Sequence, residues 1–330
     1  MRDILGGLTQ VFWNTDERRF RALLRFVATL GIFLLAASLV ESTGVLLGVL
    51  FANLGVGIAA RTAVVQLFVL ALTVGATLGI TWAVDRRHLR DLGLAVDSQW
   101  WTDLFAGLGI GVVMAVATVG AGVGLGAGSV EGVLTAQGTG QFEGLSPPVG
   151  VVLGIGLFAL LVFLYELLFR GYLLVNTAEG LFRAVGTSRA VGTGVVASTV
   201  LFGLAHAPLP AASLTSGLPV TLFALLLATT VAVTGQLALA LGVHTAWALL
   251  VGPVFGLPFR GFELSAALVR VEFDGPVVLT GGAFGPEGGL LALVGLALGF
   301  VGVAGWFRQQ GRTFAAAETI VVPDLWITDE

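Results

Sequence analysis

The chain has no cysteine and no lysine, and only 11% of its 330 residues are charged. Without cysteine it can form neither a disulfide nor a thiolate metal site, and it has no cysteine nucleophile. It has no basic tract that would indicate nucleic acid as a partner, and no His-Glu-x-x-His segment of the zincin type. A lysine-free chain with a formal net charge of −4 is typical of a GC-rich, salt-adapted prokaryote, or of codon bias alone.

Apolar residues make up 56% of the chain, and its mean hydropathy is +0.98. A water-soluble domain of this length cannot bury so much apolar surface, so we expect an all-α, polytopic bundle of transmembrane helices with an intramembrane polar cavity. Eight apolar segments have about the length of one span, near 23–40, 62–84, 104–126, 149–176, 190–207, 218–234, 236–254 and 289–307. The glycine-rich stretch 43–59 is predicted to be a surface loop or a re-entrant piece.

Arginine placement predicts the orientation of the bundle, because cytoplasmic loops carry an excess of basic residues. With eight spans, the arginine clusters beside the spans fall on one side, whereas the loops 127–148 and 208–217 contain no arginine. The clusters are Arg18, Arg19, Arg21 and Arg25 before the first span, Arg86, Arg87 and Arg90 after the second, Arg183 and Arg189 after the fourth, and Arg308 and Arg312 after the eighth. We therefore expect a multi-pass protein of the cell membrane with both termini cytoplasmic.

The same placement predicts three regions along the chain. Residues 1–22 form a cytoplasmic N-terminal segment, 23–307 the transmembrane bundle, and 308–330 a cytoplasmic acidic tail. The N-terminal segment is polar and contains arginine, so we do not expect a cleavable signal peptide.

The ionisable residues Glu166, Arg170, His206 and His244 lie inside or at the edge of three of the apolar segments. Ionisable groups are costly in hydrocarbon, so they usually face the protein interior and serve a function. Glu166 and Arg170 share a helix face and can form a structural ion pair, and a lone histidine is most often a hydrogen-bonded core residue. Together, however, they indicate a site, either a general base with electrophilic partners or a metal site, for zinc for example. The metal alternative requires Glu166, His206 and His244 within about 4 Å of a common point.

Three short motifs carry these residues in order: Tyr165-Glu166-x-x-x-Arg170-Gly171, Phe202-x-x-x-His206 and His244-x-x-x-Ala248. Over about residues 149–254 they resemble the CPBP family of intramembrane proteases, which includes the CAAX prenyl endopeptidases and the bacteriocin-processing and abortive-infection-type membrane proteins. The resemblance implies an eight-helix bundle with a water-containing cavity. It also implies that a glutamate and a histidine hydrolyse a peptide bond of a membrane-embedded or membrane-anchored substrate. Older descriptions of the family call its members metalloproteases, and structural ones favour a metal-free glutamate mechanism.

Two positions depart from the family pattern of Glu-Glu-x-x-x-Arg and, in the last motif, His followed four residues later by Asn or another polar residue. Tyr165 stands where the resemblance assigns the water-activating base, and Ala248 stands where it assigns the polar residue. Glu166 corresponds to the glutamate that mainly pairs with the arginine. Because adjacent helix positions point about 100° apart, Glu166 cannot take the place of its neighbour unless the helix is rotated.

Three functions are consistent with these residues. In the first, an intramembrane endopeptidase of the CPBP type, Glu166 and His206 activate water and His244 stabilises the oxyanion. The supporting residues of this site are Arg170, Tyr165 and Phe202. In the second, the protein is a catalytically inactive relative that binds a membrane protein or a lipid in the same cavity. In the third, it is a transporter whose buried charges relay protons. The glycine-rich segment 280–289 is predicted to be a turn into the last helix or, alternatively, a lid over the site.

Overall fold

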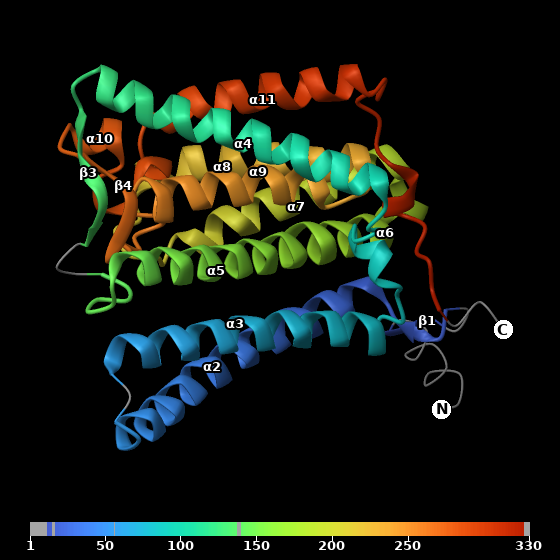
Figure 1. Ribbon diagram of the computed structural model, residues 1–330. Coiled ribbons are helices and arrows are strands. Elements are labelled where there is room, and N and C mark those ends of the chain that lie inside the picture. The colour runs from blue at the N-terminus through green and yellow to red at the C-terminus, as the bar shows by residue number, and fades with distance from the viewer. Residues whose placement is uncertain (1–11, 15–16, 56, 137–139, 327–330) are drawn as a thin grey trace.

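The computed structural model describes residues 12–14, 17–55, 57–136 and 140–326. Its long helices run side by side along one direction (Figure 1). Six helices of the described chain are long and apolar enough to cross a membrane, so the prediction of a helical membrane bundle is confirmed. They are α3 (Ile58–Ala83), α4 (Ser98–Gly124), the continuous helix Pro147–Val185, α7 (Thr187–His206), α8 (Leu214–Thr234) and α11 (Ala292–Gln309). The shorter helix Ala238–Val254 covers the seventh predicted span, and α2 (Ala22–Asn53) contains the first.

The stretch 43–59 is helical for most of its length, so the prediction of a loop or a re-entrant piece there is wrong. Helix α2 continues to Asn53, and α3 begins at Ile58. Glycine lowers helix propensity in water, but in hydrocarbon the backbone must satisfy its own hydrogen bonds, which favours the helix.

The loops at one end of the bundle contain a small sheet that the sequence did not predict. Strands β3 (Gly128–Ala136) and β4 (Ala266–Phe273) are antiparallel, and their pairing has a bulge between Val130 and Gly132. Figure 1 shows both strands at the end of the bundle away from β1. The shorter elements are β1 (Trp13–Asn14), β2 (Arg19–Phe20), η1 (Leu89–Leu92), α10 (Val277–Thr280), η4 (Gly282–Phe284), η5 (Pro286–Gly288) and η6 (Glu318–Ile320).

Two helices change from α-helical to π-helical winding at a sequence motif, one within the first motif and one shortly after the last. Helix α5 (Pro147–Glu166) continues as the π-helical segment η2 (Leu167–Leu174) and then as α6 (Val175–Val185). Helix α9 (Ala238–Leu249) continues as the π-helical segment η3 (Leu250–Val254). Such segments are rare and frequently lie at functional sites, because the extra residue per turn shifts the direction of nearby side chains.

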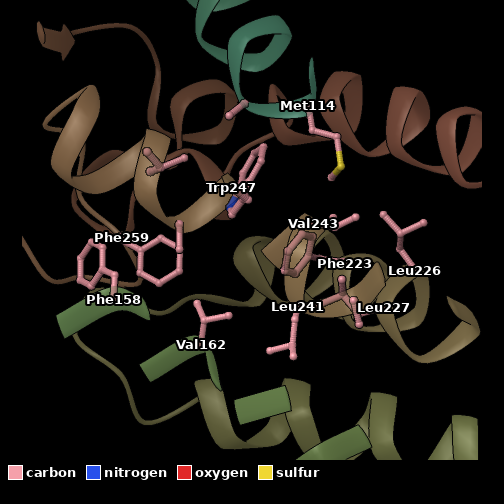
Figure 2. Packing of buried hydrophobic residues seen from close by; sticks show 14 of the residues in the cluster. Met114, Phe158, Val162, Phe223, Leu226, Leu227, Leu241, Val243, Trp247 and Phe259 are labelled. Atoms are coloured by element: carbon pink, nitrogen blue, oxygen red, sulfur yellow. The ribbon is translucent and has the colours of Figure 1, made fainter. Parts of the chain in front are cut away.

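Helix α9 lies in the centre of the bundle, in backbone contact with α4. A Cβ atom added to Gly107 of α4 would lie 2.4 Å from the Leu239 carbonyl oxygen, and one added to Gly242 of α9 would lie 2.3 Å from the Leu104 carbonyl oxygen. Only glycine allows this approach. Figure 2 shows the surrounding core, in which Trp247 of α9 lies close to Met114 of α4. The close packing fixes the position of α9 and therefore of the residues that it carries into the site.

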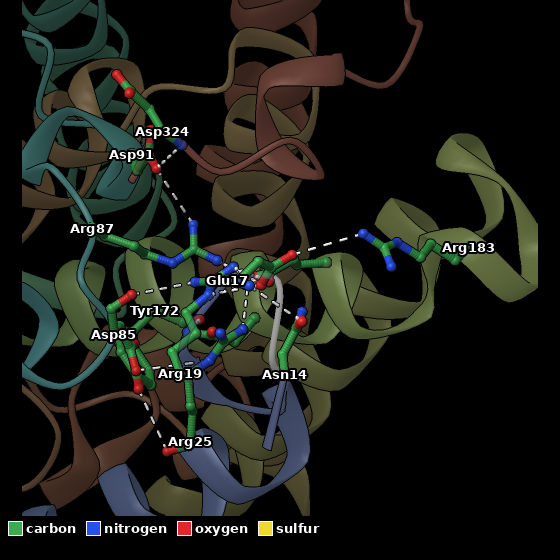
Figure 3. Close-up of polar contacts among 12 residues, drawn as sticks. Asn14, Glu17, Arg19, Arg25, Asp85, Arg87, Asp91, Tyr172, Arg183 and Asp324 are labelled. Atoms are coloured by element: carbon green, nitrogen blue, oxygen red, sulfur yellow. Dashed lines mark hydrogen bonds and ion pairs between the residues drawn. The ribbon is translucent and has the colours of Figure 1, made fainter. Parts of the chain in front are cut away.

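Three arginines at the other end of the bundle are buried rather than spread over its surface. Arg19, Arg25 and Arg87 are each at most 2% exposed, and all three form ion pairs with Glu179 of α6. Figure 3 shows these side chains converging, with Asp85 beside them. Three of the arginines that predict the orientation of the bundle therefore belong to a buried ion-pair network. This network joins the N-terminal segment, the α3–η1 connection and α6. Removal of one partner from such a network leaves an uncompensated buried charge.

Asp91 connects this end of the bundle to the C-terminal tail, and burial raises the pKa of its carboxyl to about 6, although Arg87 opposes the shift. Its Oδ2 accepts a hydrogen bond from the Asp324 backbone N–H. Because the pKa in the folded state lies above the ordinary 3.8, folding favours the protonated form. The resulting stabilisation is complete below about pH 4 and is lost as the pH rises through 6.

We expect the denaturant midpoint of unfolding of the wild type to decrease, relative to that of Asp91→Asn, as the pH is raised from about 4 to about 7. The variant is the control, because it lacks only this titrating carboxyl. A difference between the two proteins that stays constant over this range would contradict the prediction.

Candidate functional site

Glu166 and Arg170 form the ion pair that their spacing predicts, in the middle of the continuous helix. Glu166 is the last residue of α5, Arg170 lies in η2, and both side chains are fully buried. Arg170 Nη1 donates to Glu166 Oε1 at 3.1 Å, and Arg170 Nη2 donates to the Ala224 carbonyl oxygen of α8 at 3.1 Å. The guanidinium thus joins two helices and neutralises a carboxylate that could not otherwise remain charged there.

His244 of α9 shares the same carboxylate oxygen. Its Nδ1 lies 2.6 Å from Glu166 Oε1, and its Nε2 lies 2.7 Å from Arg260 Nη2. A guanidinium has only donors, so Nε2 must accept from Arg260, and the proton of a neutral ring must then be on Nδ1, which donates to Glu166. Both ring nitrogens are therefore occupied, one by a carboxylate and one by a cation.

Arg260, which lies in the loop between η3 and β4 and was not predicted as a site residue, belongs to the site. It is 2% exposed, and its Nε donates to Glu287 Oε2 of η5 at 3.2 Å. Glu287 Oε1 in turn accepts from Trp247 Nε1 of α9 at 2.6 Å. Burial raises the pKa of the Glu287 carboxyl above its ordinary value, and Arg260 opposes this shift. No local pattern marks Arg260 or Glu287, because loop arginines and glutamates are ordinarily solvated.

His206, the last residue of α7, has one nitrogen bound and one without a partner. Its Nδ1 lies 2.6 Å from the Phe202 carbonyl oxygen. A carbonyl only accepts, so the proton is on Nδ1, and Nε2 carries the free lone pair. Nε2 has no hydrogen-bond partner among the described residues, and the side chain is 3% exposed. A buried imidazole with a free lone pair can accept a proton from water.

The Phe202 ring holds the polar groups of the site together. The guanidinium carbon of Arg170 lies 4.3 Å from its centroid and that of Arg260 lies 5.2 Å from it. The ring centroids of His206 and His244 lie 4.3 and 6.2 Å from the same centroid. Cations over an aromatic face are attracted to it electrostatically, so Phe202 contributes more than bulk.

Tyr165 and Ala248, the two positions that depart from the family pattern, both lie at the site. The Tyr165 ring lies 5.4 Å from the His206 ring, and the Arg260 guanidinium lies over it at 5.2 Å. Ala248 is fully buried on α9, four residues after His244. Neither brings a carboxylate or an amide to the polar groups.

The arrangement of Glu166, His206 and His244 does not fit a metal ion such as zinc. Both nitrogens of His244 are engaged, and His206 Nδ1 is bound to a backbone oxygen. Among the residues that the structure describes, no group of three or more histidine, aspartate or glutamate side chains is arranged to hold a metal. Arg170 is hydrogen-bonded to Glu166 and Arg260 to His244, so each of these two side chains is already paired with a cation.

A cavity of about 420 Å³ lies between α3 and α5 and reaches Tyr165 and Arg260. Its walls are mostly apolar and include Val65, Val69, Leu157, Phe158, Leu161 and Phe262. An apolar pocket with a few convergent polar groups is the usual form of a binding site. An apolar ligand in this cavity would therefore meet the polar groups of the site at Tyr165 and Arg260.

Comparison with known proteins identifies one part of the chain. Residues 147–250 match the family described as type II CAAX prenyl endopeptidase Rce1-like. The match begins with α5, ends just after α9 and contains all three motifs. No curated protein and no solved structure matches the chain.

Proposed function

Because residues 147–250 match the Rce1-like family, we propose that this multi-pass membrane protein is an endopeptidase that hydrolyses a peptide bond of a membrane-associated substrate. The observation that carries the proposal is the free Nε2 of His206, a buried base against the ring of Tyr165, which lines the cavity between α3 and α5. Peptide hydrolysis requires such a base to take a proton from the attacking water.

In this proposal His206 is the general base, and the buried polar network keeps its surroundings in place. Glu166 Oε1 accepts from both Arg170 and His244, while Oε2 has no partner among the described residues. Glu166 therefore supports the site, and its free oxygen is available to a water molecule. This proposal assigns the base role to His206, whereas the sequence-based hypothesis has Glu166 and His206 activate water together.

The arrangement of the chain ends favours the predicted orientation. Trp326 Nε1 donates to the Trp82 carbonyl oxygen, and Arg19 donates to the Asp85 carbonyl oxygen. The first and last described segments thus lie at one end of the bundle, which is also the arginine-rich end. We infer that this end is cytoplasmic.

A second candidate function, ligand binding without hydrolysis, is favoured by one observation. Tyr165 occupies the position of the family's catalytic glutamate, and within the described residues no carboxylate is hydrogen-bonded to His206. In this alternative the cavity still accepts an apolar peptide or lipid.

Cleavage of membrane-anchored reporter peptides by the purified protein in lipid vesicles distinguishes the two functions. We expect the wild type to cleave and His206→Ala to lower kcat by about 10²–10⁴-fold. His88→Ala is the matched control, because His88 lies before η1, away from the site. Cleavage by His206→Ala at the wild-type rate would contradict the proposal. No cleavage by well-folded wild type would favour the second candidate.

A further inference from the structure

We propose that Arg260 is a catalytic residue of this protein, whose Nη1 group binds the oxyanion formed during hydrolysis and replaces the polar residue that is missing at Ala248. The inference rests on the proposed function for its catalytic part. Its anion-binding part can be measured without turnover.

The backbone around Arg260 is shaped to present this side chain. Phe259 and Phe262 exchange two backbone hydrogen bonds, of 2.8 and 3.0 Å. The two residues between them have positive φ angles, +54° at Arg260 and +80° at Gly261, which is the pattern of a type I′ turn. A Cβ atom on Gly261 would lie 2.2 Å from the Pro210 carbonyl oxygen, so only glycine fits there. An arginine with positive φ is uncommon, and backbone strain of this kind clusters at functional sites.

The partners of Arg260 use two of its three nitrogens and leave the third free. Nε donates to Glu287 and Nη2 donates to His244. Nη1 has no partner among the described residues, although the side chain is buried. A buried donor without an acceptor is costly, and a bound anion would supply the missing acceptor.

The free nitrogen of Arg260 and the free nitrogen of His206 belong to groups that contact the same two rings. Both groups contact Tyr165. The guanidinium carbon of Arg260 lies 5.2 Å from the Tyr165 ring centroid, and the His206 ring centroid lies 5.4 Å from it. Both also contact Phe202, at 5.2 and 4.3 Å. A scissile carbonyl between them would meet the base on one side and a cation on the other, as acyl transfer requires.

His244 cannot supply the oxyanion contact in this structure, because its Nε2 accepts from Arg260 and carries no proton. We therefore assign the oxyanion-stabilising role predicted for His244 to Arg260, which is hydrogen-bonded to it. Arg260 carries a full charge in a site from which bulk water is excluded, where electrostatic stabilisation is strongest.

The reaction then proceeds in two balanced steps. Water attacks the carbonyl carbon, its proton goes to His206 Nε2, and the electron pair of the C=O bond moves to the oxygen, which Arg260 Nη1 binds. The C=O bond then re-forms, the C–N bond breaks, and His206 returns the proton to the leaving nitrogen. The products are a carboxylic acid and an amine.

The test uses an apolar peptide in which a phosphonate anion replaces one peptide bond, together with its uncharged methyl ester, bound to the protein in lipid nanodiscs. Arg260→Gln is made together with Glu287→Gln, so that no buried carboxylate is left unpaired. Glu287→Gln alone is the matched control, and Arg308→Gln, an exposed position on α11, controls for net charge. If the double variant does not fold, Arg260→Lys replaces it.

We expect the wild type and Arg308→Gln to bind the anion about tenfold or more tightly than the ester, and the double variant to lose this preference relative to Glu287→Gln alone. In the double variant we also expect kcat to fall by about 10²–10³-fold with little change in KM. Addition of Ala248→Asn to the double variant should restore part of the lost kcat. With Arg260→Lys, we expect a weakened preference and a lowered kcat, because a point charge lacks the planar donor geometry of a guanidinium.

Equal binding of the two probes to the wild type, or a preference that survives without Arg260, would overturn the inference. An unchanged preference and kcat in Arg260→Lys would overturn it too. An Arg260-dependent preference in a protein that cleaves nothing would support the anion site and refute hydrolysis.

Discussion

Glu166→Gln should lower the free energy of unfolding by about 3–5 kcal/mol, the usual cost of removing one partner from a buried ion pair. The glutamine keeps the shape of the side chain but removes the negative charge between Arg170 and His244. The glutamine oxygen can still accept from Arg170, but Arg170 would then be left with two neutral acceptors, this oxygen and the Ala224 carbonyl oxygen, and no negative charge to pair with it. A fully buried guanidinium whose charge is not neutralised is destabilising, because no solvent can screen it.

A double-mutant cycle separates charge from packing in this prediction. Arg170→Met removes the cation while it fills similar space, so Glu166→Gln together with Arg170→Met should be more stable than Glu166→Gln alone. The measurement is the denaturant midpoint of each variant in detergent. An unchanged midpoint for Glu166→Gln would contradict the buried ion pair, since it would mean that the carboxyl is already neutral.

Tyr165→Glu should raise the rate of peptide cleavage by about 10²–10⁴-fold, the usual contribution of a positioned general base. The substitution places a carboxylate beside His206 and below the Arg260 guanidinium, where the tyrosine ring now lies. It also restores the glutamate that the family pattern has at this position. Because Tyr165 lines the cavity, the new group would face a substrate bound there.

The control for this gain is Tyr165→Gln, which has the same length as glutamate and no charge. His206→Ala in the Tyr165→Glu background should cancel most of the increase, because both groups would act on one water molecule. Steady-state cleavage in lipid vesicles measures all of these variants. A rate that stays at the wild-type level would mean that the new carboxylate pairs with Arg260 and does not activate water.

The sequence by itself was sufficient to predict the membrane bundle and to indicate a polar site within it. Segments of about 20 apolar residues can satisfy their backbone in hydrocarbon only as helices, which is why the predicted spans agree with the helices. The pairing of Glu166 with Arg170 was also predictable, because residues four apart share a helix face. A common site for these two residues with His206 and His244 was predicted because ionisable groups in apolar segments usually face the protein interior, and the resemblance to a family supported it.

The tertiary structure alone decided which of the loop charges are buried and which residues complete the site. Arg19, Arg25 and Arg87 look like ordinary loop arginines in sequence, yet Glu179 draws them into one buried network. Arg260 likewise enters the site through a turn whose position depends on contacts with distant segments. Sequence periodicity reports only neighbours along one helix, whereas burial of a charge depends on partners brought close by folding. For this reason the membrane fold could be predicted from the chain, and the cation that binds His244 could not.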